Sequence, residues 1–296
     1  MTSLISIADL ATSQIEGLLD LASQLKQEPG DRAAGRLIVP MFFEPSTRTR
    51  MSFDIASARL GANVIEFDPE TSSAVKGESL RDTAQTVGAL GPDLIIIRHP
   101  RAGAPEAVAR WSGRPVINGG DGRRAHPTQT LADLLTMRAH FGDLNGLRVG
   151  IVGDIANSRV ARGLLDSLPR FGAEITGIGP PGFVPRDLPW DMARTTDLDS
   201  KLGELDVVYL LRVQKERGGA LAYPSDAEYH TRFGLSEERS QLMKPDCVVM
   251  HPGPINRGVE IAGSLVDSER SLILDQVSAG VHVRMAVIAS IVEGLL

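Results

Sequence analysis

The chain has 296 residues and a mass of 31.7 kDa, and its hydrophobic fraction of 42% and charged fraction of 23% are typical of a globular protein with a substantial core. A net charge of −6 and a pI near 5.6 argue against nucleic-acid and membrane-surface partners, because both require a broad basic face. No apolar run approaches the roughly 18 residues of a membrane span, and the N-terminus lacks a leader pattern, so we expect a cytoplasmic protein.

The cysteine and histidine content gives no sign of a metal centre. The single cysteine, Cys247, begins an apolar run, so we expect a buried thiol and no intrachain disulfide. The six histidines show no metal-ligand spacing. We therefore expect neither a metal nor a cofactor.

The first half of the chain alternates helical and strand patterns. A helix is expected over residues 13–25, where Ser13 and Glu16 are spaced as a capping box. Strands are expected over residues 37–43, 63–67, 94–98 and 115–118, and helices after residue 46, over 80–90, over 105–111 and from Pro127. Such alternation predicts a parallel sheet joined by helical crossovers.

The second half repeats this alternation after the turn signal Asp-Leu-Asn-Gly at residues 143–146. Strands are expected over residues 147–152, 174–178, 207–211 and 247–250, with helices over 158–168 and 281–295. The predicted fold is α/β with two domains, each a parallel sheet flanked by helices, and with the apolar C-terminal helix packing back on the N-terminal domain. The expected divisions are residues 1–142, 143–280 and 281–296.

Residues 46–50, Ser-Thr-Arg-Thr-Arg, stand between a predicted strand and a predicted helix. The first turn of a helix has unpaired N–H groups and a partial positive charge, which favour an anion there. The hydroxyls add donors, and Arg48 and Arg50 offer planar forks that match phosphate oxygens. On composition alone, an ordinary capped helix with two solvated arginines is equally compatible.

Polar residues also follow the other predicted strands, and ligands of open parallel sheets bind at the carboxyl ends of strands. They are Arg98 and His99, residues 154–159, residues 212–217 and residues 251–257. These residues supply arginines and hydrogen-bond donors. They contain neither the paired carboxylates nor the Ser/His/Asp order of other catalytic sites, so they predict a site that binds several negative charges. Gly150 and Gly153 have the spacing G-x-x-G, which is only a weak match to a dinucleotide-binding turn.

Four motifs together resemble the catalytic chains of the aspartate carbamoyltransferase family. They are FFEPSTRTRMSFDIASARLGA from Phe42, the pair Arg98 and His99, HPTQTLADLLT from His126, and RVQKER from Arg212. The resemblance extends over nearly the whole chain in the same order. It implies transfer of a carbamoyl group from carbamoyl phosphate to the amine of L-aspartate, giving N-carbamoyl-L-aspartate and phosphate, an early step of pyrimidine biosynthesis.

The resemblance also implies which residues do this, and we expect the following sets. Carbamoyl phosphate would be bound by Ser46, Thr47, Arg48, Thr49, Arg98, His126, Gln129, Gly253 and Pro254, and L-aspartate by Lys76, Arg159, Arg212 and Gln214. The catalytic residues would be Arg48, Thr49, Lys76, Arg98 and His126. Lys76, and less securely Ser72, match a loop that family members lend to a neighbouring subunit, so a homotrimer with shared sites is expected.

Several alternatives stay open at this stage. Ornithine-specific relatives share the phosphate-binding turn, but their His-Cys-Leu-Pro motif reads His-Pro-Gly-Pro here, from His251, and the run from Arg212 suits a carboxylate better than an ammonium group. The effect of Gly253 on carbamoyl phosphate affinity is open. A catalytically silent homologue and a dinucleotide-binding protein are further alternatives. The assembly could be a bare trimer, or one joined by dihydroorotase or by regulatory chains.

Overall fold

The computed structural model describes residues 3–69, 77–213 and 225–296, and the chain divides into two compact units. Unit 1 contains Met1–Leu135 together with Val277–Leu296, and unit 2 is Thr136–Gln276. The chain therefore passes from one unit to the other twice. Both passages lie within helices, α5 (Pro127–Phe141) and α11 (Ile273–Val292). The resemblance implies a carbamoyl-phosphate-binding domain over residues 1–142 and an aspartate-binding domain over residues 143–280, and these roles stay a prediction.

The sheet of unit 1 is parallel, with the strand order β2-β1-β3-β4. Its strands are β1 (Leu37–Phe42), β2 (Asn63–Val64), β3 (Leu94–His99) and β4 (Val116–Asp121). Phe42 at the end of β1 pairs in register with Arg98 near the end of β3. Because parallel strands end at the same edge, this register places Arg98 beside the turn that follows β1.

Both faces of this sheet are buried, as is usual for parallel strands. The helices around it are α1 (Thr12–Gln27), α2 (Thr47–Arg59), α3 (Leu80–Leu90) and α4 (Ala104–Ser112), after a short 3₁₀ turn at Ile7–Asp9. Val39 of β1 and Ile95 of β3 belong to a core cluster with Val87 of α3 and Val108 of α4. Helices α3 and α4 pack so closely that a side chain at Gly88 would overlap Ser112.

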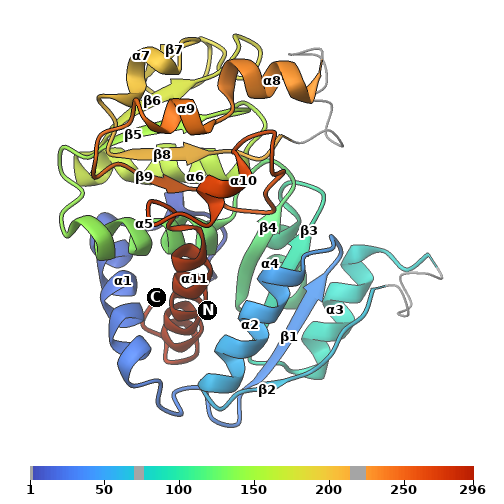
Figure 1. Ribbon diagram of the computed structural model, residues 1–296. Helices are drawn as coiled ribbons and strands as arrows, with labels where there is room; N and C mark the ends of the chain where they lie inside the picture. Colours follow the sequence, from blue (N-terminus) through green and yellow to red (C-terminus); the bar gives the residue numbers. More distant parts are fainter. Residues whose placement is uncertain (1–2, 70–76, 214–224) are drawn as a thin grey trace. The chain divides into compact units, whose positions relative to one another are not determined.

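The sheet of unit 2 is also parallel, in the order β7-β6-β5-β8-β9 (Figure 1). Its strands are β5 (Arg148–Val152), β6 (Glu174–Ile178), β7 (Ala193–Thr195), β8 (Val207–Leu210) and β9 (Val248–Met250). The helices of this unit are α6 (Arg159–Ser167), α7 (Asp199–Leu202), α8 (Asp226–Phe233), α9 (Glu237–Ser240) and α10 (Gly263–Val266), with a 3₁₀ turn at Leu168–Phe171. A side chain at Gly150 would overlap Leu205, so close packing accounts for this glycine.

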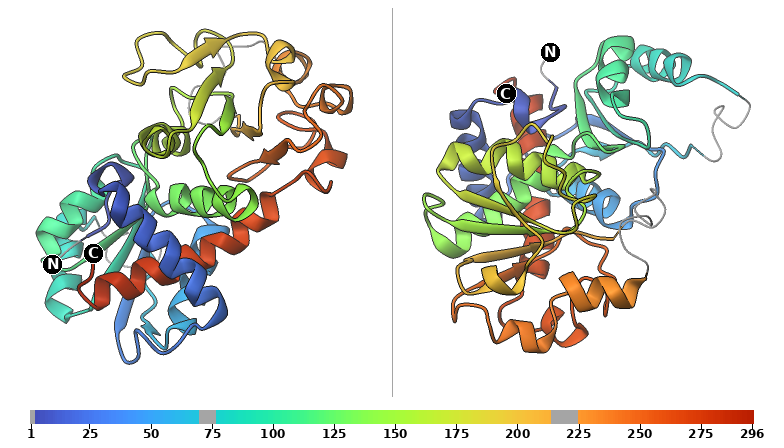
Figure 2. Two further views of the ribbon diagram at one scale, coloured as in Figure 1. Left: turned by 90° about the vertical axis from the view of Figure 1, so that its left-hand side faces the viewer. Right: turned by 90° about the horizontal axis from the view of Figure 1, so that it is seen from above.

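Helix α11 confirms the expectation that the C-terminal helix packs against the N-terminal part of the fold. Its unit 1 portion lies alongside α1 (Figure 2), and Arg32 after α1 forms an ion pair of 2.8 Å with Glu293. The residues from Met285 to Ala289 are fully buried. The helix begins at Ile273 rather than at residue 281, because its first two turns are more polar than the apolar stretch that marks it in the sequence.

Other boundaries also differ from the predictions. The expected capping box of Ser13 and Glu16 is wrong: helix α1 begins at Thr12, and the Gln14 side chain accepts a 2.9 Å hydrogen bond from the N–H of Ala11. Strand β4 continues past Asn118 to Asp121, and the short strand β7 was not predicted. Two glycines in β4 and the shortness of β7 remove the apolar pattern that marks a strand.

Cys247 is buried, as predicted, and burial raises the pKa of its thiol to about 12. Because the thiolate is the reactive form, we expect native protein to react negligibly with a thiol reagent at pH 8 and to react fully after unfolding in guanidinium chloride. Titration with a chromogenic disulfide at both conditions measures this. Rapid labelling of the folded protein would contradict a buried position.

Within residues 3–69, 77–213 and 225–296, no helix is both long enough and apolar enough to cross a membrane.

Candidate active site

The turn after β1 and the first residues of α2 form the first part of the candidate site. Ser46 is the N-cap residue in an extended conformation, and its side chain does not cap the helix. Its carbonyl accepts from the N–H of Arg50, and the N–H groups that precede Arg50 in the first turn have no helical carbonyl to bond. Thr47 and Arg48 are exposed and Thr49 is buried. The hydroxyl of Ser46 and the helix N-terminus are therefore available to an anion.

The two arginines of this turn differ in their contacts. Arg50 forms an ion pair of 3.0 Å with Asp54 one turn later, and its guanidinium lies 5.7 Å from the ring centre of Phe42. In the described parts of the chain, no hydrogen bond or ion pair holds the side chain of Arg48. Arg48 is thus the arginine of the turn that can turn toward a phosphate.

Arg98 lies at the end of β3 and is buried. Its Nη2 donates to Oε1 of Glu44 at 2.6 Å, and its Nη1 donates to Oγ1 of Thr49 at 3.4 Å and to the carbonyl of Gly119 at 3.3 Å. The structure therefore brings Arg98 and Thr49 together, as the sequence predicts for one anion site. Glu44 partly balances the charge of the buried guanidinium.

Asp121, at the end of β4, shapes the loop that leads to His126. Its carboxylate accepts from Asn118 Nδ2 at 2.9 Å, from the N–H of Gly103 at 2.8 Å and from the N–H of Ala125 at 3.0 Å. His126 is buried and stands just before α5, and its carbonyl accepts the first helical hydrogen bonds. The imidazole is therefore held by a loop that has little freedom.

Gln129 and Arg284 extend this polar region inside unit 1. Gln129 of α5 donates from Nε2 to Oδ1 of the buried Asp133 at 2.9 Å. Arg284 of α11 lies 5.0 Å from the ring centre of Phe53 and donates to the carbonyl of Gly280 at 2.7 Å. Burial, and then the positive charge of Arg98, lower the pKa of Arg284 to about 9, so it stays cationic at neutral pH.

Arg159 and Arg212 stand after strands of unit 2, as expected. Arg159 is the first residue of α6 and is buried, and Ser158 caps this helix by accepting from the N–H of Ala161 at 3.1 Å. Arg212 follows β8 and is half-buried. Buried or half-buried guanidinium groups at strand ends suit a carboxylate ligand.

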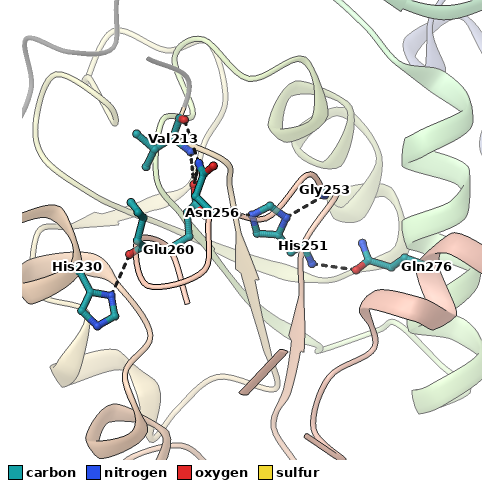
Figure 3. A network of polar contacts seen from close by, with 8 residues as sticks. Val213, His230, His251, Gly253, Asn256, Glu260 and Gln276 are labelled. Carbon is teal, nitrogen blue, oxygen red and sulfur yellow. Dashed lines mark hydrogen bonds and ion pairs between the residues drawn. The ribbon is translucent and has the colours of Figure 1, made fainter. Parts of the chain in front are cut away.

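Gly253 and Pro254 follow β9 in a loop fixed by His251 (Figure 3). The N–H of Gly253 donates to Nδ1 of His251 at 2.8 Å, and the N–H of His251 donates to Oε1 of Gln276 at 2.9 Å. Gly253 has φ = 65°, a left-handed conformation that favours glycine. The local backbone thus accounts for glycine at this position.

The expected residues therefore fall into two groups, one in each unit. Unit 1 holds Ser46, Thr47, Arg48, Thr49, Arg98, His126 and Gln129, and unit 2 holds Arg159, Arg212, Gly253 and Pro254. Ser72, Lys76 and Gln214 lie outside the described residues. No group of three or more histidine, cysteine, aspartate or glutamate side chains within the described ranges is arranged to hold a metal ion.

The hydrogen-bond partners of these residues were not predicted from the sequence. Glu44, Asp121 and Glu260 each accept hydrogen bonds from the segments that carry the candidate groups. Glu44 directly follows the predicted strand, which was a usable signal. Glu260 has no such signal, because a buried carboxylate far along a loop resembles any surface glutamate in sequence.

Comparisons with known proteins match two family domains to successive parts of the chain. Residues 2–139 match the carbamoyl-P binding domain of aspartate/ornithine carbamoyltransferases, and residues 145–291 match the Asp/Orn binding domain. The aspartate carbamoyltransferase catalytic subunit of Parafrankia sp. (strain EAN1pec) is 45% identical over 99% of this chain and 97% of its own length. The corresponding subunit of Desulforapulum autotrophicum is 44% identical over 98% and 96%.

Solved structures are similar over the same extent. Aspartate transcarbamoylase from Trypanosoma cruzi in complex with carbamoyl aspartate and phosphate has a TM-score of 0.90 and 31% identity, with 98% of this chain and 95% of that chain covered. The complex of the same enzyme with carbamoyl phosphate and aspartate has a TM-score of 0.89 and 32% identity, with 98% and 96% covered. The chain thus belongs to the aspartate/ornithine carbamoyltransferase family.

Proposed function

We propose that this chain is an aspartate carbamoyltransferase, which transfers a carbamoyl group from carbamoyl phosphate to the amine of L-aspartate. The main support for this activity is that the chain is 44–46% identical, over nearly its whole length, to eight proteins named as catalytic subunits of this enzyme. The site residues support it, because they supply the cations and neutral donors that bind phosphate and carboxylate groups.

Unit 1 would bind carbamoyl phosphate. The N-terminus of α2, with Ser46, Thr47 and Arg48, would hold the phosphate, whose charge increases as the bond to the carbonyl carbon breaks. Thr49, Arg98 and His126 would donate to the carbonyl oxygen, and Gln129 would orient the amide. Donors that are fixed before the reaction stabilise the developing charges without reorganisation, and the contacts of Arg98 fix its guanidinium in this way.

Unit 2 would bind the acceptor. Arg159 and Arg212 would pair with the carboxylates of L-aspartate, and Gln214 would help to orient it, while the carbonyls of Gly253 and Pro254 would accept from the carbamoyl amine. The amine then attacks the carbonyl carbon, a tetrahedral intermediate forms, and it collapses with loss of phosphate and of the amine proton. No covalent enzyme intermediate is required. Holding both reactants in the right orientation supplies much of the rate increase.

The test is carbamoylation by the purified chain with L-aspartate and, in parallel, with L-ornithine. We expect N-carbamoyl-L-aspartate and phosphate in equal amounts, and no citrulline. Product with ornithine alone would reassign the acceptor. No product with either would favour the catalytically silent homologue.

A homotrimer with shared sites is also proposed, because the expected role of Lys76 is in a neighbouring subunit's site. Lys76→Ala and Arg212→Ala should each lower activity to near zero, because each substitution removes a cation from the site. After mixing under subunit exchange, we expect activity to return, since some sites then contain neither substitution. Sedimentation should show a trimer, and absence of recovery despite verified exchange would contradict sharing.

A dihydroorotase or a regulatory chain is a further proposed partner. The names of the relatives describe catalytic subunits, which supports an assembly of more than one kind of chain. Co-purification of the chain from its own cells tests this proposal.

A further inference from the structure

Glu260 is a buried carboxylate that joins two loops of unit 2. Its side chain is 1% exposed, and it lies in the loop after β9, beyond the Gly253 and Pro254 turn. Its own carbonyl accepts from the N–H of Leu235 at 2.9 Å, which anchors its backbone at a second point. Burial is the main reason why the pKa of Glu260 is raised above its ordinary value. A buried carboxylate is costly, so its hydrogen bonds must compensate for the loss of water.

The hydrogen bonds of Glu260 join Asn256 to Val213, the residue after Arg212. Oε1 accepts from the N–H of Val213 at 2.7 Å and from Nδ2 of Asn256 at 2.7 Å, while Oε2 accepts from the N–H of Asn256 at 2.8 Å. Nδ2 of Asn256 also reaches the carbonyl of Val213 at 3.5 Å. Both sides of the Val213 residue are thus held by one pair of side chains (Figure 3).

This contact fixes the backbone at Arg212. The N–H of Leu211 donates to the carbonyl of Val152 at 2.8 Å, so the segment is held by the sheet before Arg212 and by Glu260 after it. Because the backbone is held on both sides of Arg212, the position of its Cα and the direction of its Cα–Cβ bond are fixed.

His251 faces the other oxygen of the same carboxylate. Its Nδ1 accepts from the N–H of Gly253, so the neutral ring carries its proton on Nε2. That Nε2 lies 3.9 Å from Oε2 of Glu260, which is an electrostatic contact rather than a hydrogen bond. The hydrogen bond from the N–H of Gly253 to His251 therefore does not involve Glu260. A substitution of Glu260 should act first on Arg212.

We propose that Glu260 is a positioning residue for L-aspartate, because its carboxylate holds the Val213 peptide and thereby sets the direction of Arg212. The proposal rests on the proposed function, since it assumes that Arg212 binds the acceptor substrate. It assigns to Glu260 no contact with either substrate.

Glu260→Gln is the sharpest test, because it keeps the shape and replaces one acceptor oxygen with a donor. Both oxygens accept from N–H groups in the native protein, so either orientation of the amide places a donor against a donor. Loss of a hydrogen bond to a charged group corresponds to roughly a tenfold or greater weakening. We expect the KM for L-aspartate to rise by at least about tenfold, and the KM for carbamoyl phosphate to stay within about twofold.

Glu237→Gln is the matched control. Glu237 lies in the same unit, and its Oε1 accepts from Oγ of Ser264 at 2.6 Å between exposed side chains, with no contact to residues 211–213. The same chemical change there should leave both KM values unchanged. If Glu260→Gln does not fold, Asn256→Ala replaces it; this removes only the amide contacts, and we expect a smaller rise in the KM for L-aspartate.

Binding of succinate, a dicarboxylate without the amine, gives a second readout by calorimetry in the presence of carbamoyl phosphate. Succinate binding should weaken in Glu260→Gln by about the same factor as the KM for L-aspartate rises. A wild-type KM for L-aspartate, or equal shifts for both substrates, would overturn the positioning role. If the native chain forms no N-carbamoyl-L-aspartate at all, the proposed function fails instead, and succinate binding still tests Glu260.

Discussion

Replacing Arg48 with alanine is expected to lower kcat by about 10³-fold, because a guanidinium on a departing phosphate stabilises charge that increases in the transition state. Steady-state assays with both substrates saturating measure this. The exposed position of Arg48 means that the variant should keep its fold, so the loss would report on chemistry. Circular dichroism and the unfolding midpoint should match those of the native chain.

Arg50→Ala is the natural control for this experiment. It removes the same side chain from the same turn, but Arg50 is engaged with Asp54 and with the ring of Phe42. We expect Arg50→Ala to lose about 1 kcal/mol of stability, as is usual for an ion pair within one partly exposed helical turn, and to keep most of its activity. Equal losses in the two variants would mean that the turn as a whole, and not Arg48, carries the effect.

Replacing Arg98 with alanine is expected to lower kcat by about 10²- to 10³-fold, the usual result of removing one donor to a developing oxyanion. The three acceptors around this guanidinium hold it in one orientation, so Arg98→Lys should recover little activity: a single ammonium cannot reproduce the planar fork. Single-turnover measurements would separate this loss from slow product release.

Chemical rescue distinguishes a missing donor from a damaged fold in the Arg98 variant. The substitution leaves a cavity beside Glu44, whose carboxylate loses its ion pair with Arg98. Added guanidinium at millimolar concentration should occupy this cavity and restore part of kcat, while urea, which is similar in shape and uncharged, should not. Restoration by both compounds, or by neither in a folded variant, would argue against a charge-based role.

The sequence predicts which polar residues follow the strands, because an apolar run marks each strand and parallel strands end at the same edge of a sheet. An apolar run followed by Arg98, in register with the run that ends at Phe42, places the arginine at the turn that carries Thr49. The sequence cannot tell Arg48 from Arg50 by composition. That distinction depends on Asp54 one helical turn later, a local pair that is visible only when the helix phase is known.

The carboxylates that support the site were not predictable in the same way. Glu44 and Glu260 are both charged residues in loops, and sequence patterns assign such residues to the surface. Glu44 is half-buried and accepts from the guanidinium of Arg98, while Glu260 is buried and accepts from the N–H groups of Val213 and Asn256. The contacts of Glu260 connect residues separated by 47 positions in the chain, and no local spacing indicates such a pair.

The return of α11 to unit 1 has a consequence for synthesis of the protein. A chain that grows from its N-terminus produces the whole sheet of unit 1 long before it produces Val277–Leu296. Until then, the surface that later covers residues such as Val283 and Met285 has no partner, and exposed apolar surface favours aggregation. Unit 2 is continuous in sequence and is complete first. Helix α11 therefore completes unit 1 after unit 2 has been made, and a ribosome that stops before this helix would release a chain with one finished unit and one open core.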